Sequence, residues 1–217
     1  VIPQIPPVEV KQQQDTGIKI NLKSLIILAP KELQNIIDKE KYYKMTIGVP
    51  QSINDLYNIA YEIERDFNQK GYPLVRVILP VQELEPEQAS VFFKVIDGFI
   101  EKIDLSKVPK AQTLRTYAYL KPLINKKNMT LKLLERQLLL ASNSAGLTLT
   151  SSLIPGAKEG STRLVIEAKH KLLSGGISFD NTQSEQLGRQ QGQANTNISS
   201  AFGLGETISL FGLARPT

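Results

Sequence analysis

The sequence has no cysteine, no tryptophan and a single histidine, His170. The absence of cysteine excludes disulfides and thiolate metal sites. It also suits a compartment in which stray thiols are a hazard, such as the periplasm. No apolar run approaches the roughly 18 residues that a membrane-spanning helix requires. The first expectation is therefore a protein without disulfides, thiolate metal sites or helical membrane spans, whose lack of cysteine is compatible with the periplasm.

A strong excess of one charge is also missing. Lysine and arginine together number 26 and aspartate and glutamate 21, which gives a net charge of +5. The longest basic run is Lys126-Lys127, whereas nucleic-acid-binding proteins usually gather basic residues on one helix or stripe. We therefore expect no nucleic acid partner.

Residues that would support catalysis are missing or badly placed. His170 lies between two lysines at the end of a predicted strand, where we expect it to be exposed, and no serine stands in a Gly-x-Ser-x-Gly motif. The acidic run 83–87 lacks the spacing of a Ca²⁺ loop. Gly203 and Gly205 do not follow a strand and open a helix, as a dinucleotide site requires. We expect no enzyme activity, no catalytic residue, no cofactor, no metal ion and no small-molecule substrate.

The beginning of the sequence has the pattern of a linker. Residues 1–16 contain Pro3, Pro6 and Pro7, which disfavour helix and central strand, and a polar run of glutamines. The first residue is Val1 rather than methionine, so we interpret the sequence as a mature or trimmed chain.

The next segment has the pattern of a small α+β unit. Ser52 stands at capping-box distance from Asp55, and the apolar residues that follow recur with the period of a helix. Gly71 supplies the left-handed stop of this helix. The predicted elements are a strand at 18–22, a short helix that opens at Pro30, a helix from Ser52 to Gly71, and strands at Leu74–Leu79 and Ser90–Ile96.

The same order of elements then repeats. Gly71 precedes Pro80 by nine residues, and Gly146 precedes Pro155 by the same interval. Because internal repeats determine architecture, we predict two units of strand–helix–helix–strand–strand, each a layer of helices on a three-stranded sheet. The elements of the second unit are a strand at Phe99–Leu105, helices at Leu114–Ile124 and from Thr130 to Asn143, and strands at Leu147–Ile154 and Thr162–His170.

The composition changes again after Leu172. The remainder is rich in glycine, serine, asparagine, glutamine and threonine. We predict two amphipathic strands, at Gly175–Thr182 and Asn195–Leu213, joined by a polar turn around Glu185–Gly192. Alternation of this weakly apolar kind is typical of a membrane β-barrel.

Four segments in this order resemble one known family. The duplicated unit resembles the polypeptide-transport-associated (POTRA) domain, and "GYPLVRVILPVQ" at 71–82 and "VIDGFIEKI" at 95–103 are similar to its first copy and the link to the second. The end of the second copy is matched by "GLTLTSSLIPGAKEGSTRLVIEAKH" at 146–170, and a first barrel hairpin by "SFDNTQSEQLGRQQGQANTNISSAFGLGETISLFGLA" at 178–214. The family is that of two-partner secretion transporters, of the haemolysin-activator and filamentous-haemagglutinin type, within the Omp85 superfamily.

The resemblance implies a fold and a division into domains. The fold class is α+β, with two tandem POTRA domains (β-α-α-β-β) followed by the first β-hairpin of a transmembrane β-barrel, whose other strands the sequence lacks. The implied limits are a proline-rich linker at 1–16, POTRA domains at 17–97 and 98–172, and barrel strands at 173–217.

The resemblance also implies a function. These domains would lie in the periplasm of a Gram-negative bacterium, at an outer membrane reached through the missing barrel. They would bind the unfolded N-terminal secretion domain of a large exoprotein of the adhesin or haemolysin type and deliver it to the barrel pore.

Strand addition is the physical route that we expect for this recognition, because an edge strand leaves N–H and C=O groups unpaired. Proline at strand ends suits edge positions and marks two candidates, Leu74–Leu79 and Leu147–Ile154. Arg76 either meets client carboxylates or lies on a solvated strand face, and two tyrosines either line a contact surface or belong to the core. The candidate residues are Leu74, Val75, Arg76, Val77, Ile78, Tyr57, Tyr61, Leu147, Leu149, Ser151 and Leu153.

Two other hypotheses are kept. A related Omp85-type module would assist outer-membrane protein assembly, and it predicts longer arrays of such units ahead of the barrel. A carbohydrate-binding or hydrolytic β protein would need clustered carboxylates or tryptophan platforms, and the sequence has no tryptophan.

Overall fold

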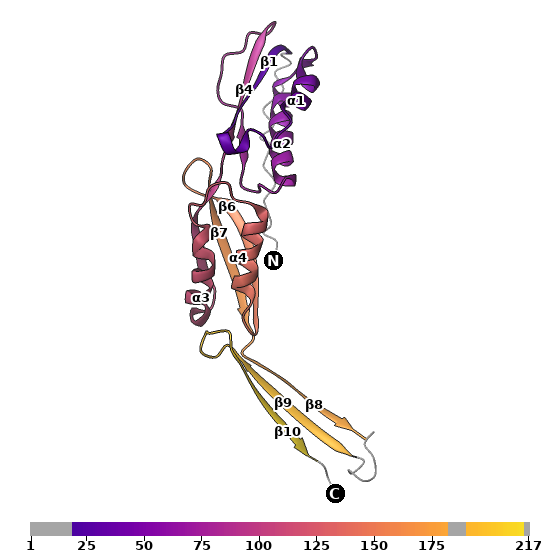
Figure 1. Ribbon diagram of the computed structural model, residues 1–217, viewed down its shortest axis with the longest axis vertical. Helices are drawn as coiled ribbons and strands as arrows, with labels where there is room; N and C mark the ends of the chain where they lie inside the picture. Colours follow the sequence, from indigo (N-terminus) through magenta and orange to yellow (C-terminus); the bar gives the residue numbers. More distant parts are fainter. Residues whose placement is uncertain (1–18, 182–189, 215–217) are drawn as a thin grey trace.

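The structure is a computed structural model that describes residues 19–181 and 190–214. Three units follow one another along the long axis of the molecule: an α+β domain, a second α+β domain and a three-stranded sheet (Figure 1). The predicted α+β class is therefore confirmed. The predicted linker at 1–16 lies outside the described residues.

The first domain is a four-stranded sheet with two helices on one face. The strand order is β2-β1-β4-β3, with β1 and β4 parallel and the two edge strands antiparallel to their neighbours. The elements are β1 (Ile20–Leu28), the 3₁₀ turn η1 (Lys31–Leu33), α1 (Lys39–Thr46), β2 (Pro50–Gln51), α2 (Ile53–Gln69), β3 (Arg76–Ile78) and β4 (Ala89–Ile96).

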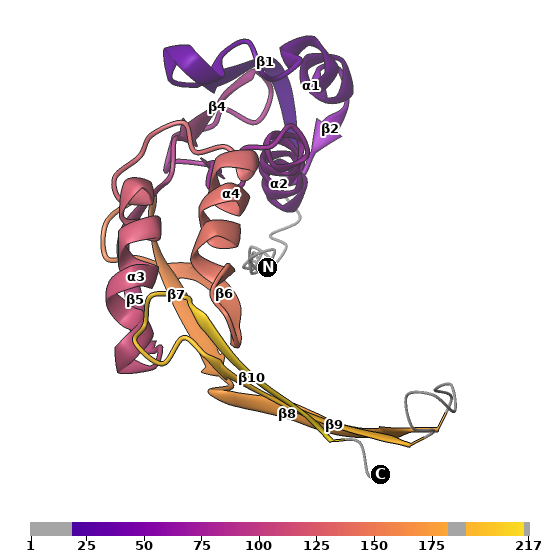
Figure 2. The ribbon, with the colours of Figure 1, turned by 60° about the horizontal axis from the view of Figure 1, so that its bottom comes forward.

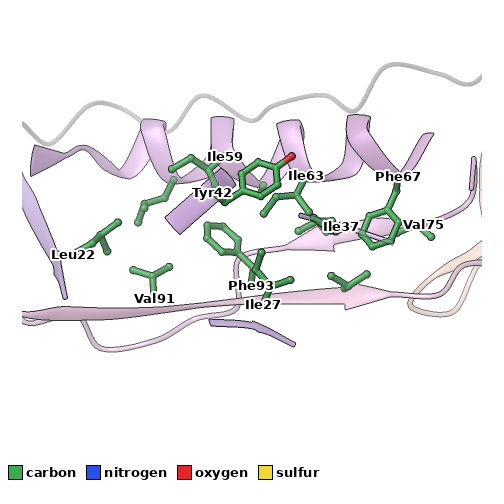
Figure 3. Packing of buried hydrophobic residues seen from close by; sticks show 14 of the residues in the cluster. Leu22, Ile27, Ile37, Tyr42, Ile59, Ile63, Phe67, Val75, Val91 and Phe93 are labelled. Atoms are coloured by element: carbon green, nitrogen blue, oxygen red, sulfur yellow. The ribbon is translucent and has the colours of Figure 1, made fainter. Parts of the chain in front are cut away.

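Helix α2 supplies most of the helical contribution to the first core. The predicted capping box is confirmed, since the Ser52 hydroxyl accepts from Asp55 N at 3.2 Å and the Asp55 carboxylate accepts from Ser52 N at 2.8 Å. The apolar stripe of the helix then packs on the inner face of the sheet, where Phe67 lies beside Val75 and Ile63 lies above the strand that carries Phe93 (Figure 3). The short helix predicted at Pro30 is a 3₁₀ turn, and α1 is a separate helix that the Asp38 carboxylate caps.

The second domain repeats this plan with three strands. Strand β7 lies between β5, to which it is parallel, and β6, to which it is antiparallel. Helix α3 begins and ends four residues earlier than predicted, because Pro109 starts it and Pro122 falls in a 3₁₀ turn that follows. The elements are β5 (Phe99–Lys107), α3 (Lys110–Leu120), η2 (Lys121–Leu123), α4 (Leu131–Ser142), β6 (Leu147–Pro155) and β7 (Ser161–His170).

The strand predicted at Leu74–Leu79 is wrong in its first half. The chain leaves α2 through Gly71, whose φ is +87°, and turns so that Val75 N donates to Tyr72 O at 3.4 Å. Strand β3 therefore begins only at Arg76. Leu74 is carried across into the core of the second domain, where its side chain is 2% exposed.

Polar contacts reinforce this junction between the two domains. Gly71 O accepts from Leu131 N, the first residue of α4, at 2.8 Å. The Asp97 carboxylate accepts from Asn128 N at 3.0 and 3.1 Å. Because these bonds tie the segment after α2 and the residue after β4 to the segment that leads into α4, they fix the orientation of the first domain on the second.

The third unit corrects the predicted hairpin. The stretch Asn195–Leu213 is not one strand but two, separated by a loop over 200–206, so the sheet has three antiparallel strands in the order β10-β9-β8. Its strands are β8 (Leu173–Asp180), β9 (Gln191–Ser199) and β10 (Thr207–Ala214). Most of the polar turn predicted at Glu185–Gly192 lies outside the described residues.

The loop at 200–206 also attaches the third unit to helix α3. The Gln112 side chain, fully buried, donates to Ser200 O at 3.3 Å, and the Arg115 guanidinium donates to Leu204 O. Gly203 has a φ of +73°, and a methyl group there would overlap the carbonyl of Ala111. Within the loop, the Phe202 N–H, which donates at 2.6 Å, is the largest of several influences that lower the pKa of the Glu206 carboxyl.

The shared position of Leu74 gives a first prediction. Leu74→Ala is expected to destabilise the second domain by about 2–5 kcal/mol, the usual cost of emptying a buried leucine site. Residue-resolved hydrogen exchange should show faster exchange in α4, whereas the adjacent control Val75→Ala should accelerate α2. Faster exchange confined to α2 in the Leu74 variant would contradict the assignment of Leu74 to the second core.

The close fit of Gly203 gives a second prediction. Gly203→Ala combines a left-handed backbone, which costs an alanine about 1–2 kcal/mol, with an overlap on Ala111, so the loop should leave α3. We expect limited proteolysis to cleave within 200–206 faster than in the parent. Gly212→Ala is the matched control, because the nearest atom to an added methyl there is 4.0 Å away. Equal cleavage rates in the two variants would contradict the docking of this loop.

Candidate functional site

The two candidate strands both lie at sheet edges. Strand β3 ends the order β2-β1-β4-β3, and β6 ends the order β5-β7-β6. They differ in length, since β3 spans three residues and β6 nine. They also differ in what faces their outer backbone groups.

The outer side of β3 is occupied by a buried carboxylate from α2. Glu64 Oε2 accepts from Val77 N at 3.1 Å, and Glu64 Oε1 pairs with Arg76 Nη1 at 2.7 Å. The Glu64 side chain is only 6% exposed. Arg76 is thus engaged within the domain, and the backbone donor that Val77 directs away from β4 already has an acceptor.

A second side chain covers the same edge of the sheet beyond the end of β3. The Gln82 amide accepts from Phe92 N at 2.9 Å and donates to Phe92 O at 3.1 Å. Phe92 lies in the part of β4 that β3 does not reach. The amide therefore makes the two bonds that an opposed residue of another strand would make.

Tyr57 and Tyr61 lie on the side of α2 that carries Glu64. Their positions are seven and three residues before Glu64, which places the three side chains along one helix face. Tyr57 is half-buried and the Tyr61 side chain is exposed. Three apolar residues of α2 are buried in the core: Leu56, Ile59 and Ile63.

The other candidate residues near β3 have little exposed surface. Leu74 is buried in the second core, and Val75 and Val77 are buried in the first. Ile78 is half-buried. Contact with an added strand at this edge would therefore be made by the backbone of β3 and by the side chains of α2.

The outer side of β6 is open over five residues. At its two ends Lys171 N donates to Gly146 O at 2.8 Å and Gly156 N donates to Ser161 O at 2.9 Å. Because bonded and non-bonded pairs alternate in an antiparallel ladder, the outward N–H and C=O groups belong to Leu149, Ser151 and Leu153. In the described parts of the chain these groups have no hydrogen-bond partner.

The ends of the open stretch are closed. Leu147 N donates to Ser144 O at 3.1 Å, and Pro155 has no N–H to offer. The side chains of Leu149 and Leu153 are buried in the core. The Ser151 hydroxyl is buried as well, and it has no partner among the residues that the structure describes.

The two domains differ at the helix position that faces the edge. Buried residues occur at the same intervals in α2, at Ala60, Glu64 and Phe67, and in α4, at Leu134, Leu138 and Ala141. The intervals of the buried residues align Glu64 with Leu138, and the count back from Gly71 and Gly146 aligns it with Leu139. Neither leucine has an oxygen that could accept a hydrogen bond from β6.

Other kinds of site find no support in the described residues. No group of three or more histidine, aspartate or glutamate side chains between 19 and 181 or 190 and 214 is arranged to hold a metal ion. No helix in these ranges is both long and apolar enough to cross a membrane. His170, expected to be exposed, is half-buried, because its strand pairs with β6 and buries its Nε2.

Comparison with known proteins gives consistent relatives. No family model matches the chain. The heme/hemopexin transporter protein HuxB of Haemophilus influenzae is 27% identical over 91% of this chain and 35% of its own length. The hemolysin transporter protein ShlB of Serratia marcescens is 26% identical over 88% of this chain and 32% of its own length. The chain therefore spans about a third of the length of these relatives.

A solved structure is similar to this chain in its fold. CdiB from Escherichia coli superposes with a TM-score of 0.62 over 97% of this chain and 39% of that protein, at 14% identity. The superposed part includes both α+β domains and the three-stranded sheet, since it covers nearly all of the chain. The chain is therefore a homologue of the outer-membrane transporters of two-partner secretion, and its two POTRA-type domains belong in the periplasm.

Proposed function

We propose that this chain is the client-binding part of a two-partner secretion translocator. It binds the unfolded N-terminal secretion domain of a large exoprotein of the adhesin or haemolysin type, and the outer-membrane barrel then carries the client across. The proposal includes no catalytic step, cofactor or small-molecule substrate. Its support is the relatedness to HuxB and ShlB, which are named as transporters.

The observation that carries the proposal is the open edge of β6. Three residues, Leu149, Ser151 and Leu153, each present an outward N–H and C=O without a partner in the described chain. An extended client segment pairs with such a row through its own backbone. Since unpaired strand edges invite association, this edge is the more receptive of the two candidate strands.

Recognition through the backbone suits a client that is unfolded and long. Backbone bonding tolerates varied sequence, while alternate side chains of the client meet neighbouring surfaces. On the solvent face of β6 these surfaces are the exposed side chains of Thr148, Thr150 and Ile154. The client is therefore recognised by its extended backbone and by the alternation of its side chains more than by a fixed sequence motif.

We also propose limits for the functional parts. The first core draws on residues from Ile20 to Val95 and the second on Leu74 and residues from Ile100 to Ile166. These cores support the division between a first domain at 17–97 and a second at 98–172. We propose from the sequence resemblance alone that 173–217 are barrel strands and that 1–16 are a linker. Leu74 is the exception, because it belongs to the first domain in sequence and to the second in packing.

The β6 edge gives a third prediction. Ser151→Pro removes an outward N–H and places a ring in the path of an added strand, while the bonds of β6 to β7 are kept. We expect the affinity for the unfolded secretion domain of the exoprotein that is encoded beside this chain to fall about tenfold, the equivalent of one hydrogen bond of roughly 1.4 kcal/mol. The measurement is a titration of the whole chain followed by fluorescence anisotropy.

The matched control is Ser151→Ala, which removes the hydroxyl and keeps the backbone donor. It should bind like the parent chain. If the proline variant keeps both its fold, judged by circular dichroism, and its full affinity, β6 is not the docking edge. If the parent chain shows no saturable binding, the proposed function itself fails.

A further inference from the structure

We infer that Glu64 holds the edge of β3 shut, and that this edge is a second, conditional docking site for an extended polypeptide. The inference rests on the proposed function, because it assumes that the client docks by strand addition. It adds a difference in availability between the two domains. The edge of β6 is open, whereas the edge of β3 becomes available only when Glu64 releases the N–H of Val77.

The geometry of Glu64 imitates an added strand. Its Oε2 lies 3.1 Å from Val77 N, on the side of β3 that faces away from β4. An incoming strand would place a carbonyl oxygen at this position, since backbone carbonyls are the natural partners of outward N–H groups. A client segment and Glu64 therefore compete for the same donor.

The carboxylate can release this donor without losing its charge partner. The bond to Val77 uses Oε2, whereas the pair with Arg76 uses Oε1 at 2.7 Å. The Arg76 side chain is 27% exposed, so it can follow the carboxylate toward solvent. A buried charge that keeps its ion pair avoids most of the penalty of isolation.

The neighbouring side chains suit a site that opens. Tyr57 and Tyr61 continue the helix face that carries Glu64, and Tyr61 is 40% exposed. Tyrosine offers an apolar ring and a polar hydroxyl to a partner surface. On the second domain the corresponding place in α4 is held by a leucine, Leu138 by the intervals of buried residues and Leu139 by the count back from Gly146, and neither has an oxygen to compete with a client.

The test replaces Glu64 by the residue type of the second copy. In Glu64→Leu, hydrogen exchange of the Val77 amide should be slowed about tenfold by saturating secretion domain, as expected for one new protecting bond. In the parent chain the client should slow Val77 exchange clearly less than in the variant, because Glu64 and the client compete for the donor. Glu64→Gln keeps a neutral oxygen acceptor, so its response should be smaller than that of the leucine variant.

The control is Glu62→Leu, which places a leucine on α2 away from β3 and should behave like the parent chain. If Glu64→Leu does not fold, the comparison of Glu64→Gln with the parent decides. Slowing of the β6 amides without any client effect on Val77 in the variants would overturn the inference. An equal effect in parent and variants would overturn it too. No slowing at Leu149, Ser151 or Leu153 in any protein at saturating client would instead show that β6 is not the docking edge, and no saturable binding at all would show that the proposed function is wrong.

Discussion

The unpaired backbone at the edge of a sheet is the constraint on which this structure depends. A strand with one neighbour leaves every second N–H and C=O without a partner, and such groups attract other strands. The first domain satisfies them with side chains, Glu64 on Val77 and Gln82 on Phe92. The second domain leaves Leu149, Ser151 and Leu153 open. Two copies of one fold thus differ in the property that decides whether they can take up a client strand.

A client bound at the open edge of β6 can be guided onward only if the second domain keeps a fixed orientation relative to the three-stranded sheet. Leu74 inserts from the first domain into the second core, and the bond from Leu131 N to Gly71 O joins the ends of two helices. On the other side, the loop at 200–206 is fastened to α3 through Gln112 and Arg115. In the described chain the second domain is therefore held at both ends, as the two views of the molecule show (Figures 1 and 2). A client bound along β6 would keep a constant orientation relative to the three-stranded sheet.

Local patterns in the sequence were sufficient for the elements whose signals are local. The capping box at Ser52, the helix that follows Thr130 and the strands of the second domain could be predicted because caps and alternation are read over a few residues. The equal Gly-to-Pro intervals predicted two similar units, but not that the segment after Gly71 turns and gives Leu74 to the other core. That exchange depends on how the domains meet, which no local pattern records.

The candidate edge strands could be located from proline positions. Whether their outward backbone groups are free or already hydrogen-bonded could not. Glu64 falls within an amphipathic helix as an ordinary charged residue, and only the fold shows that it lies beneath Val77. A helix position occupied by glutamate in one copy and by leucine in the other is a signal that alignment of the two repeats could have found. The break at 200–206 was missed because Gly203 and Gly205 were interpreted as part of a strand, whereas both have positive φ.

The most direct test of strand addition at β6 uses the absence of cysteine from the chain. A cysteine placed at Thr150, exposed on β6, would be cross-linked under mild oxidation to single cysteines moved residue by residue through the unfolded secretion domain. Because successive side chains of a strand point to opposite faces, the account predicts strong cross-linking at every second client position over one short segment. Uniform cross-linking, or none where binding is saturated, would contradict it.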